Sequence, residues 1–179
     1  MHESVMEFLR TKIVPSSEIE GKYVLEVGSR NVNGTPRSVI EPMKPAKYVG
    51  VDLMQGPGVD VVLDAGDLVR HFGRESFDVV ISTEMLEHTL DWRRAIQAMK
   101  GVLRPGGLVV ITTRGPGFPY HEHPYDYWRF TVQDFLRIFA DFQILELMDD
   151  PGAPGVFLKA RKPRAVCLDE IEVAKAQSR

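Results

Sequence analysis

The chain reads YVLEVGSRNVNG from Tyr23 to Gly34, and a second apolar run, YVGVD, follows at Tyr48–Asp52. Each run has the length and the apolar content of a buried strand, and each carries a carboxylate at its end. Gly28 and Gly34 frame the polar loop after the first run, where the absence of a side chain lets the backbone approach a ligand closely. A strand, a glycine loop and a second strand that ends in an acid predict a site for a ribose-containing ligand.

The composition is typical of one globular domain. With 179 residues the chain can bury a sizeable core, and 44% of its residues are hydrophobic while 26% are charged. No apolar run approaches the roughly 20 residues that cross a membrane, and the first residues lack the pattern of a signal peptide. The single cysteine, Cys167, and the net charge of −3 predict a cytoplasmic protein without an intramolecular disulfide and without general affinity for nucleic acid or membranes.

Apolar residues at helical spacing predict a helix close to the N-terminus. Ser4–Glu7 matches a capping box that would start this helix. Its apolar face is predicted to comprise Val5, Met6, Leu9 and Ile13. We expect three parts in the chain: a helical lead-in over residues 1–21, a main domain over residues 22–162, and a polar tail over residues 163–179 with a short helix at 169–176.

Five more apolar runs predict strands: Val59–Leu63, Phe77–Ile81, Leu108–Thr112, Phe142–Leu147 and Val156–Ala160. The connection between the last two is too short for a helical crossover, so we expect an antiparallel hairpin at one end of the sheet. Apolar strands separated by helices predict a mostly parallel sheet that is covered on both faces. The predicted fold class is a doubly wound, Rossmann-like α/β sheet of seven strands that ends in a hairpin.

Two amphipathic helices are predicted inside the main domain. The first is capped by Thr89 or Asp91, and the turn Pro105–Gly107 follows it. Its apolar stripe comprises Trp92, Ile96, Met99 and Leu103. The second begins at Thr131, where Asp134 completes a capping box. Its buried face is predicted to comprise Val132, Phe135, Leu136 and Phe139.

Acidic residues and glycines recur in a fixed order after successive predicted strands. The motifs are Val24–Gly28, Asp52, Leu63–Ala65, Phe77–Ser82 with Glu84–His88 after it, and the turn Leu103–Gly107. On these motifs the chain resembles the class I S-adenosylmethionine-dependent methyltransferases over roughly residues 22–162. Several elements match in order, which makes the resemblance more specific than one glycine loop. It implies S-adenosylmethionine as the cofactor and methyl transfer as the reaction.

The resemblance also implies which residues hold the cofactor. Glu26 and Gly28 match positions that flank its methionine part, Asp52 matches the position on the ribose hydroxyls, and Asp64 matches the one on the adenine amino group. The implied set is Glu26, Gly28, Ser29, Gly34, Asp52, Leu53, Asp64, Ala65, Ser82 and Glu84. The chain departs from the usual motif because Gly28 and Gly34 are six residues apart, and the longer loop is similar to that of a subgroup of small methyltransferases.

Structural explanations exist for several of these residues. Gly28 suits any tight turn after a strand, and Asp64 could simply cap the helix that follows it. His88 lies four residues after Glu84, so the two could share a face at the start of a helix. His88 either lines the site of methyl transfer or bonds a backbone carbonyl.

The segment from Pro116 to Phe130 concentrates aromatic, histidine and charged residues and contains three prolines. Because it follows the fifth strand of the parallel part, it is expected above the ligand-binding edge of the sheet. His121 or His123 is predicted to act as a general base, since imidazole titrates near neutrality, and His88 is a further catalytic candidate. The residues predicted to bind the acceptor are Tyr120, Tyr125, Asp126, Trp128 and Arg129.

The same segment has two other interpretations. Trp128 and Phe130 could pack as a lid while an ion pair between Asp126 and Arg129 holds the loop. His121 and His123 could ligate a metal, but no second cluster of ligands stands out in the sequence, so no metal site is predicted.

The predicted function is methyl transfer from S-adenosylmethionine to a small molecule or glycan, at oxygen more than at nitrogen. The Asp/Asn-Pro-Pro-aromatic motif of enzymes that methylate nucleobase amino groups is absent, because Ser82–Met85 occupies that place. A Pro-Cys nucleophile for cytosine chemistry is absent too. Two alternatives stay open: a nicotinamide-dependent oxidoreductase, and a cofactor-binding subunit without its own activity. The sequence does not define an oligomeric state.

Overall fold

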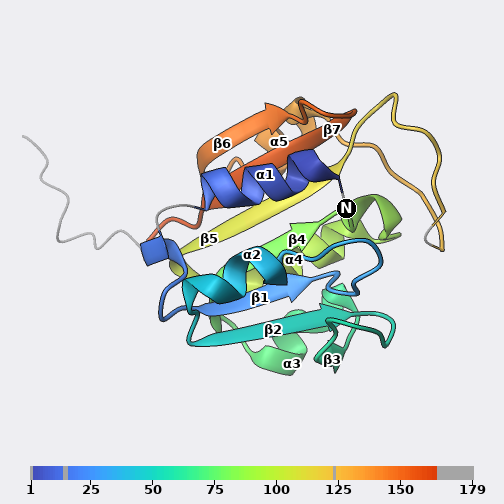
Figure 1. Cartoon of the computed structure of the whole chain (residues 1–179). Coiled ribbons are helices and arrows are strands. Elements are labelled where there is room, and N and C mark those ends of the chain that lie inside the picture. The colour runs from blue at the N-terminus through green and yellow to red at the C-terminus, as the bar shows by residue number, and fades with distance from the viewer. Residues whose placement is uncertain (1, 14–15, 123, 165–179) are drawn as a thin grey trace, which may run out of the picture.

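A computed structural model of the chain describes residues 2–13, 16–122 and 124–164 (Figure 1). Its centre is a sheet of seven strands in the order β3-β2-β1-β4-β5-β7-β6. The strands are β1 (Tyr23–Val27), β2 (Lys47–Asp52), β3 (Val61–Val62), β4 (Phe77–Thr83), β5 (Leu103–Arg114), β6 (Gln143–Asp149) and β7 (Gly155–Arg161). The predicted fold class is confirmed.

Strand direction follows the length of each connection. β1 pairs in parallel with β2 on one side and with β4 on the other, and β4 pairs in parallel with β5. β7 runs antiparallel to both β5 and β6. The short link between Asp149 and Gly155 leaves no room for a crossover, so the chain turns back on itself and closes the predicted hairpin.

Helices cover both faces of the sheet (Figure 1). The helices are α1 (Glu3–Lys12), α2 (Arg37–Ile40), α3 (Leu68–Phe72), α4 (Trp92–Val102) and α5 (Val132–Ile138). Neighbouring strand residues enter different cores: Val24 packs with α1 and α2, whereas Leu25 packs with α3, α4 and α5. Strands that are buried on both faces must be apolar throughout, which explains the continuous apolar runs in the sequence.

The helix starts were predicted with mixed success. Asp91 caps α4 by accepting a hydrogen bond from the Arg94 amide at 3.1 Å, and Thr131 forms the predicted capping box with Asp134 at the start of α5. The predicted box at Ser4 is wrong, because α1 begins at Glu3 and the buried Ser4 hydroxyl has no hydrogen-bond partner among the described residues.

Two core assignments change as well. Leu136 was predicted to be buried but is 40% exposed, since α5 is short and turns this position to solvent. Leu103 is buried as expected, but it is the first residue of β5 because the helix ends at Val102. The predicted helix at 169–176, Cys167 and His123 lie outside the described residues.

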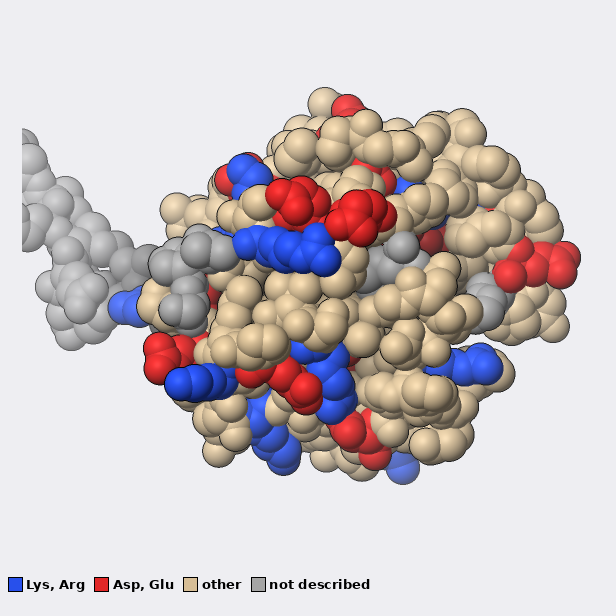
Figure 2. Space-filling model, viewed as in Figure 1, with Lys and Arg blue, Asp and Glu red and all other residues tan. Residues whose placement is uncertain are grey.

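Positive and negative side chains are interspersed on the face shown in Figure 2. Several of the surface charges form ion pairs, such as Arg10 with Glu3 at 2.8 Å. Within the described residues, no helix is both long enough and apolar enough to span a bilayer.

Candidate functional site

A cavity of about 660 Å³ lies at the ends of β1, β2 and β4. Carboxyl ends of parallel strands are where open α/β sheets bind ligands, because the loops that follow them diverge there. Eight of the ten predicted cofactor residues line this cavity: Glu26, Gly28, Gly34, Asp52, Leu53, Asp64, Ala65 and Glu84. Residues from four separate stretches of sequence are thus brought to one place.

Gly28 begins the loop after β1 and serves both as a turn and as a point of close approach. Its backbone has a φ of +84°, which L side chains rarely adopt. A Cβ at this position would lie 2.6 Å from Cγ of Met85. The amides of Gly28 and Ser29 both donate to the carbonyl of Val51, at 2.9 and 3.0 Å, and so fix the loop against β2.

Glu26 places a carboxyl group at the floor of the cavity. The residue is 1% exposed, and Tyr48 Oη donates a hydrogen bond of 2.6 Å to its Oε2. Burial raises the pKa of Glu26 to about 7, and the hydrogen bond from Tyr48 offsets part of that effect. The carboxyl group is therefore close to its titration midpoint at neutral pH.

Asp52 ends β2, and backbone amides orient its carboxylate. Oδ2 accepts a hydrogen bond from the Arg30 amide at 3.1 Å, and Oδ1 accepts one from the Met54 amide at 3.0 Å. Leu53 continues the cavity wall and is 67% exposed. Each oxygen can accept a second hydrogen bond, so the aspartate can still hold two hydroxyl groups of a ligand.

Asp64 acts as a cap, as the structural explanation predicted, and also lines the cavity. It precedes the short 3₁₀ turn Ala65–Asp67, and its Oδ1 accepts a hydrogen bond of 2.7 Å from the Gly66 amide as a cap. It also lines the cavity together with Ala65. The cap therefore fixes a carboxylate at the cavity wall.

Glu84 stands at the turn after β4 in a left-handed conformation, with a φ of +53°. It forms an ion pair with the fully buried Arg114 and accepts a hydrogen bond of 2.9 Å from Thr112 Oγ1. Arg114 also pairs with the buried Asp150 at 3.1 Å. Glu84 therefore lies at the cavity edge while its carboxylate is anchored in the protein interior.

Two predicted cofactor residues, Ser29 and Ser82, are placed in the interior rather than along the cavity. Both are fully buried, and neither hydroxyl has a hydrogen-bond partner among the described residues. Ser29 packs against Gly50, where an added Cβ would lie 2.7 Å from the serine Oγ. Their positions at strand ends suggested contact with a ligand, but the local backbone turns both side chains into the fold.

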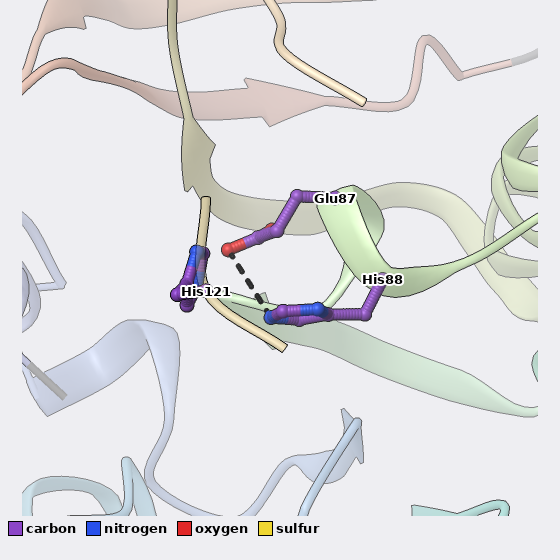
Figure 3. A group of neighbouring side chains, drawn as sticks. All are labelled: Glu87, His88 and His121. Atoms are coloured by element: carbon purple, nitrogen blue, oxygen red, sulfur yellow. Dashed lines mark ion pairs between the residues drawn. The ribbon is translucent and has the colours of Figure 1, made fainter. Parts of the chain in front are cut away.

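Three side chains meet beside the cavity: His88 and His121, which line it, and the buried Glu87 behind them (Figure 3). Glu87 and His88 belong to the 3₁₀ turn Leu86–His88 that follows β4, and His121 comes from the loop between β5 and α5. Nε2 of His88 lies 4.0 Å from Oε1 of Glu87. The two imidazole rings are 4.8 Å apart between centroids and meet edge to face.

Glu87 is a residue that the sequence analysis did not single out. It is 0% exposed, and Thr113 Oγ1 donates a hydrogen bond of 2.8 Å to its Oε2. Burial and the nearby Glu84 raise the pKa of Glu87 to about 8. The only sequence signal was its membership of the motif Glu84–His88, because no periodicity marks which side chain of a 3₁₀ turn faces inward.

The loop before α5 is held against the turn Leu86–His88 by polar contacts. The amides of Tyr127 and Trp128 both donate to the carbonyl of Glu87, and the Trp128 indole donates to the carbonyls of Thr89 and Leu90 at 3.1 and 3.3 Å. Asp126 forms a two-pronged ion pair with Arg129. The loop thus has the structural ion pair and packing that were the alternative to acceptor binding.

The predicted acceptor residues separate into two groups. Tyr125 lines the cavity, as do the catalytic candidates His88 and His121. The other four predicted acceptor residues are described but do not line the cavity: Tyr120, Asp126, Trp128 and Arg129. His88 also has its predicted structural role, because its Nδ1 donates to the carbonyl of Tyr125 at 2.5 Å.

Other cavity residues were not among the predicted site residues. They include Arg30, Thr83, Met85, Asp91, Arg94 and Tyr127. Arg94 reaches the cavity from α4 and pairs with Asp67 at 2.6 Å. The packing of α4 beside the 3₁₀ turn Ala65–Asp67 places Arg94 next to a motif that is far away in the chain.

Comparison with known proteins identifies the family. A family model described as "Methyltransferase domain" matches residues 2–153. The phthiotriol/phenolphthiotriol dimycocerosates methyltransferase of Mycobacterium tuberculosis is 36% identical over 117 residues, which cover 59% of this chain and 39% of that protein. The ubiquinone biosynthesis O-methyltransferase of Pseudomonas syringae pv. tomato is 32% identical over 111 residues, which cover 54% and 46%. The matches span less than half the length of these two relatives.

Solved structures share the fold at low sequence identity. An S-adenosylmethionine-dependent methyltransferase from Mesorhizobium loti gives a TM-score of 0.70 at 18% identity and covers 89% of this chain and 98% of its own. The 1,6-didemethyltoxoflavin-N1-methyltransferase of Burkholderia thailandensis gives 0.66 at 19% identity, with 86% and 79% covered. Because the family model matches most of this chain, the chain belongs to the methyltransferase-domain family. Its resemblance to class I S-adenosylmethionine-dependent methyltransferases implied the same.

Proposed function

We propose that this protein transfers a methyl group from S-adenosylmethionine to an oxygen atom of a small molecule. One observation carries the proposal: Glu26, Gly28, Asp52 and Asp64 line a single cavity in the order in which their strand ends occur in the sheet. In the resembling family these are the positions of the methionine, ribose and adenine contacts.

The cavity fits this cofactor in shape and in chemistry. Its volume of about 660 Å³ lies within the usual range for small-molecule and cofactor sites. Gly28 has no side chain to project into the cavity, and Met85 packs where a Cβ would lie. Glu26 would face the ammonium group of the methionine part, Asp52 would accept hydrogen bonds from the ribose hydroxyls, and Asp64 with Ala65 would flank the adenine.

When bound, the cofactor supplies a methyl group that a nucleophile can attack at carbon, with the bond to the sulfonium sulfur breaking and S-adenosylhomocysteine leaving. The chain's own contribution is then to align the acceptor, exclude water and remove a proton. His88 and His121 line the cavity next to Tyr125, so these residues are the ones positioned to receive an acceptor. His123 remains a candidate from the sequence and lies outside the described residues.

The choice of a small molecule and of oxygen rests on the relatives and on the loop. One relative is named an O-methyltransferase of ubiquinone biosynthesis, while a structural neighbour is named an N1-methyltransferase. A hydroxyl group must lose a proton to become a good nucleophile, and imidazole groups at the cavity suit that need. A glycan acceptor is a second possibility because its hydroxyl groups pose the same chemical problem.

A calorimetric titration tests the cofactor proposal. The purified chain is titrated with S-adenosylhomocysteine, S-adenosylmethionine and NADH, and the Asp52→Ala variant is titrated in parallel. We expect saturable binding of the two sulfur nucleosides and a loss of about a hundredfold in affinity in the variant, because two hydrogen bonds to a charged group disappear. Asp141→Ala serves as the control, since that exposed carboxylate pairs with Lys100 away from the cavity.

The outcomes separate the alternatives. Preference for NADH would support an oxidoreductase and contradict the proposal. Binding of S-adenosylmethionine without methyl transfer to any hydroxyl compound in a screen would support a cofactor-binding subunit instead.

A further inference from the structure

We propose that Glu87, His88 and His121 form a site for a divalent transition-metal ion at the acceptor side of the cavity. One ligand atom from each of these side chains lies within 4.8 Å of the other two. The sequence predicted no metal site because His121 lacked a second cluster of ligands. Folding supplies that cluster, since the turn after β4 brings Glu87 and His88 to the loop that carries His121 (Figure 3).

The contacts of His88 fix which of its nitrogens faces the cluster. Nδ1 lies 2.5 Å from the carbonyl oxygen of Tyr125. A carbonyl oxygen can only accept a hydrogen bond, so Nδ1 must carry the proton. In the neutral ring Nε2 then holds the lone pair, and this is the atom that lies 4.0 Å from Glu87 Oε1. A ring nitrogen bonded to a backbone carbonyl is the usual support for a metal-ligating histidine.

The ring of His121 lies beside a carboxylate, but its Nδ1 makes no hydrogen bond among the described residues. Its Nδ1 lies 3.2 Å from Oδ2 of Asp126, and its backbone amide donates to the same oxygen at 2.8 Å. Asp126 is in turn held by the guanidinium of Arg129. Carboxylates behind histidine ligands orient the ring and make it more basic. This gives Asp126 and Arg129 a positioning role in place of the acceptor contact that the sequence suggested.

Glu87 supplies the oxygen ligand. Its side chain is fully buried, and Thr113 holds Oε2 while Oε1 has no hydrogen-bond partner among the described residues. Leaving a buried carboxylate oxygen without a partner is costly. A cation between Oε1 and the two imidazole nitrogens would satisfy it.

The ligand set indicates the class of ion and leaves room for a further ligand. Two histidines and one glutamate are a known protein ligand set for catalytic zinc, in which a fourth position stays open. Bonds of about 2.1 Å to zinc place tetrahedral ligand atoms about 3.4 Å apart. The ligand atoms now lie within 4.8 Å of one another, so zinc binding would shorten their separations by up to about 1.5 Å. His88 and His121 line the cavity, so the open position would face it.

The role of the ion rests on the proposed function. A divalent cation beside the acceptor hydroxyl would lower the pKa of that hydroxyl and favour its ionised form at neutral pH. The two histidines would then act as ligands and neither would be the general base, so the proton of the metal-bound hydroxyl would pass to solvent water.

Cobalt binding to the full chain tests the site independently of turnover. The purified protein is stripped with a chelator, dialysed and titrated with Co²⁺, whose visible absorption reports nitrogen and oxygen ligation, and Zn²⁺ is then added as a competitor. We expect one Co²⁺ per chain, displaced by Zn²⁺, and affinity at least about tenfold weaker in His121→Ala, His88→Ala and Glu87→Gln. His71→Ala and Cys167→Ser are controls, because both residues are alternative metal ligands outside the cluster.

Binding of S-adenosylhomocysteine is measured on every variant as a separate test of the cofactor site. No saturable Co²⁺ binding by the wild-type chain would overturn the metal proposal, as would unchanged binding in His121→Ala. That variant decides the question if Glu87→Gln fails to fold, because His121 lies in a loop and its side chain is about one-third exposed. If the wild-type chain does not bind S-adenosylhomocysteine, that result would contradict the proposed function and would not affect the conclusion on the metal site.

Discussion

At the scale of single residues, the cavity depends on carboxyl groups whose surroundings differ. Glu26 is buried beneath the cavity and has a raised pKa, whereas Asp52 is held by backbone amides at the cavity wall. Both were predicted from the strand ends on which they stand. The sequence could not show how differently the two groups are solvated, because burial depends on which strands and loops surround each end.

Glu26 gives a prediction for the pH dependence of cofactor binding. Because burial raises its pKa to about 7, the carboxyl group is protonated at pH 6 and ionised at pH 8. Only the ionised form attracts the ammonium group of S-adenosylmethionine. Affinity should therefore rise by about tenfold from pH 6 to pH 8, as calorimetry at several pH values would show.

The Glu26→Gln variant provides the matched comparison. The amide keeps the shape of the side chain and does not titrate, so we expect weaker binding with a flatter pH profile. An equally steep profile in the variant would assign the titration to another group.

At the scale of secondary-structure elements, capping residues decide where helices begin. Thr131 Oγ1 accepts a hydrogen bond from the Asp134 amide at 3.2 Å, while Asp134 accepts one from the Thr131 amide at 2.9 Å. A similar pattern at Ser4 does not form, because the chain enters α1 one residue earlier and the hydroxyl is buried. A local motif thus predicts a helix start only where the preceding chain leaves it free to act as the cap.

The capping box of α5 predicts a measurable loss of stability. Thr131→Ala removes the side-chain acceptor at the helix start and should lower the free energy of unfolding by about 1 kcal/mol. Urea unfolding followed by circular dichroism would measure the change. Ser4→Ala is the control, and it should have little effect because its hydroxyl has no hydrogen-bond partner among the described residues. A greater loss from Ser4→Ala than from Thr131→Ala would contradict this account.

At the scale of the whole molecule, Arg114 joins parts that are distant in the chain. It ends β5 with a fully buried side chain, pairs with Glu84 after β4, and pairs with Asp150 in the hairpin connection. Its guanidinium also stacks over Phe118, with 5.0 Å from Cζ to the ring centroid. The cavity edge, the central sheet and the C-terminal hairpin therefore share one buried cation.

Removing that cation should destabilise the whole domain. Arg114→Leu leaves the buried carboxylate of Asp150 without its charged partner, and we expect a loss of about 3–5 kcal/mol in the free energy of unfolding. Urea denaturation would measure it. Arg104→Leu removes the partner of Asp78 near the surface and should cost at most about 1 kcal/mol. Equal losses in the two variants would show that burial of the Arg114 ion pairs does not add to the free energy of unfolding.

The sequence by itself determined the seven strands, the C-terminal hairpin, the helices α1, α4 and α5, and eight of the ten predicted cofactor residues that line the cavity. These features rest on local signals: apolar runs, glycine turns, and acids at strand ends such as Glu26 and Asp52. Parallel strands must present their carboxyl ends at one edge, so the positions of these residues followed from the pattern alone.

Only the tertiary structure decided which side chains face the cavity and which face the interior. Ser29 and Ser82 turn inward, Asp126 and Arg129 hold the loop, and Glu87 meets histidines from two separate segments. The Asp126–Arg129 pair is local and was one of the two interpretations of its segment, whereas the other outcomes depend on contacts between residues that are far apart in the chain. Sequence periodicity describes one element at a time, so it carries no information about how a loop after one strand packs on a turn after another.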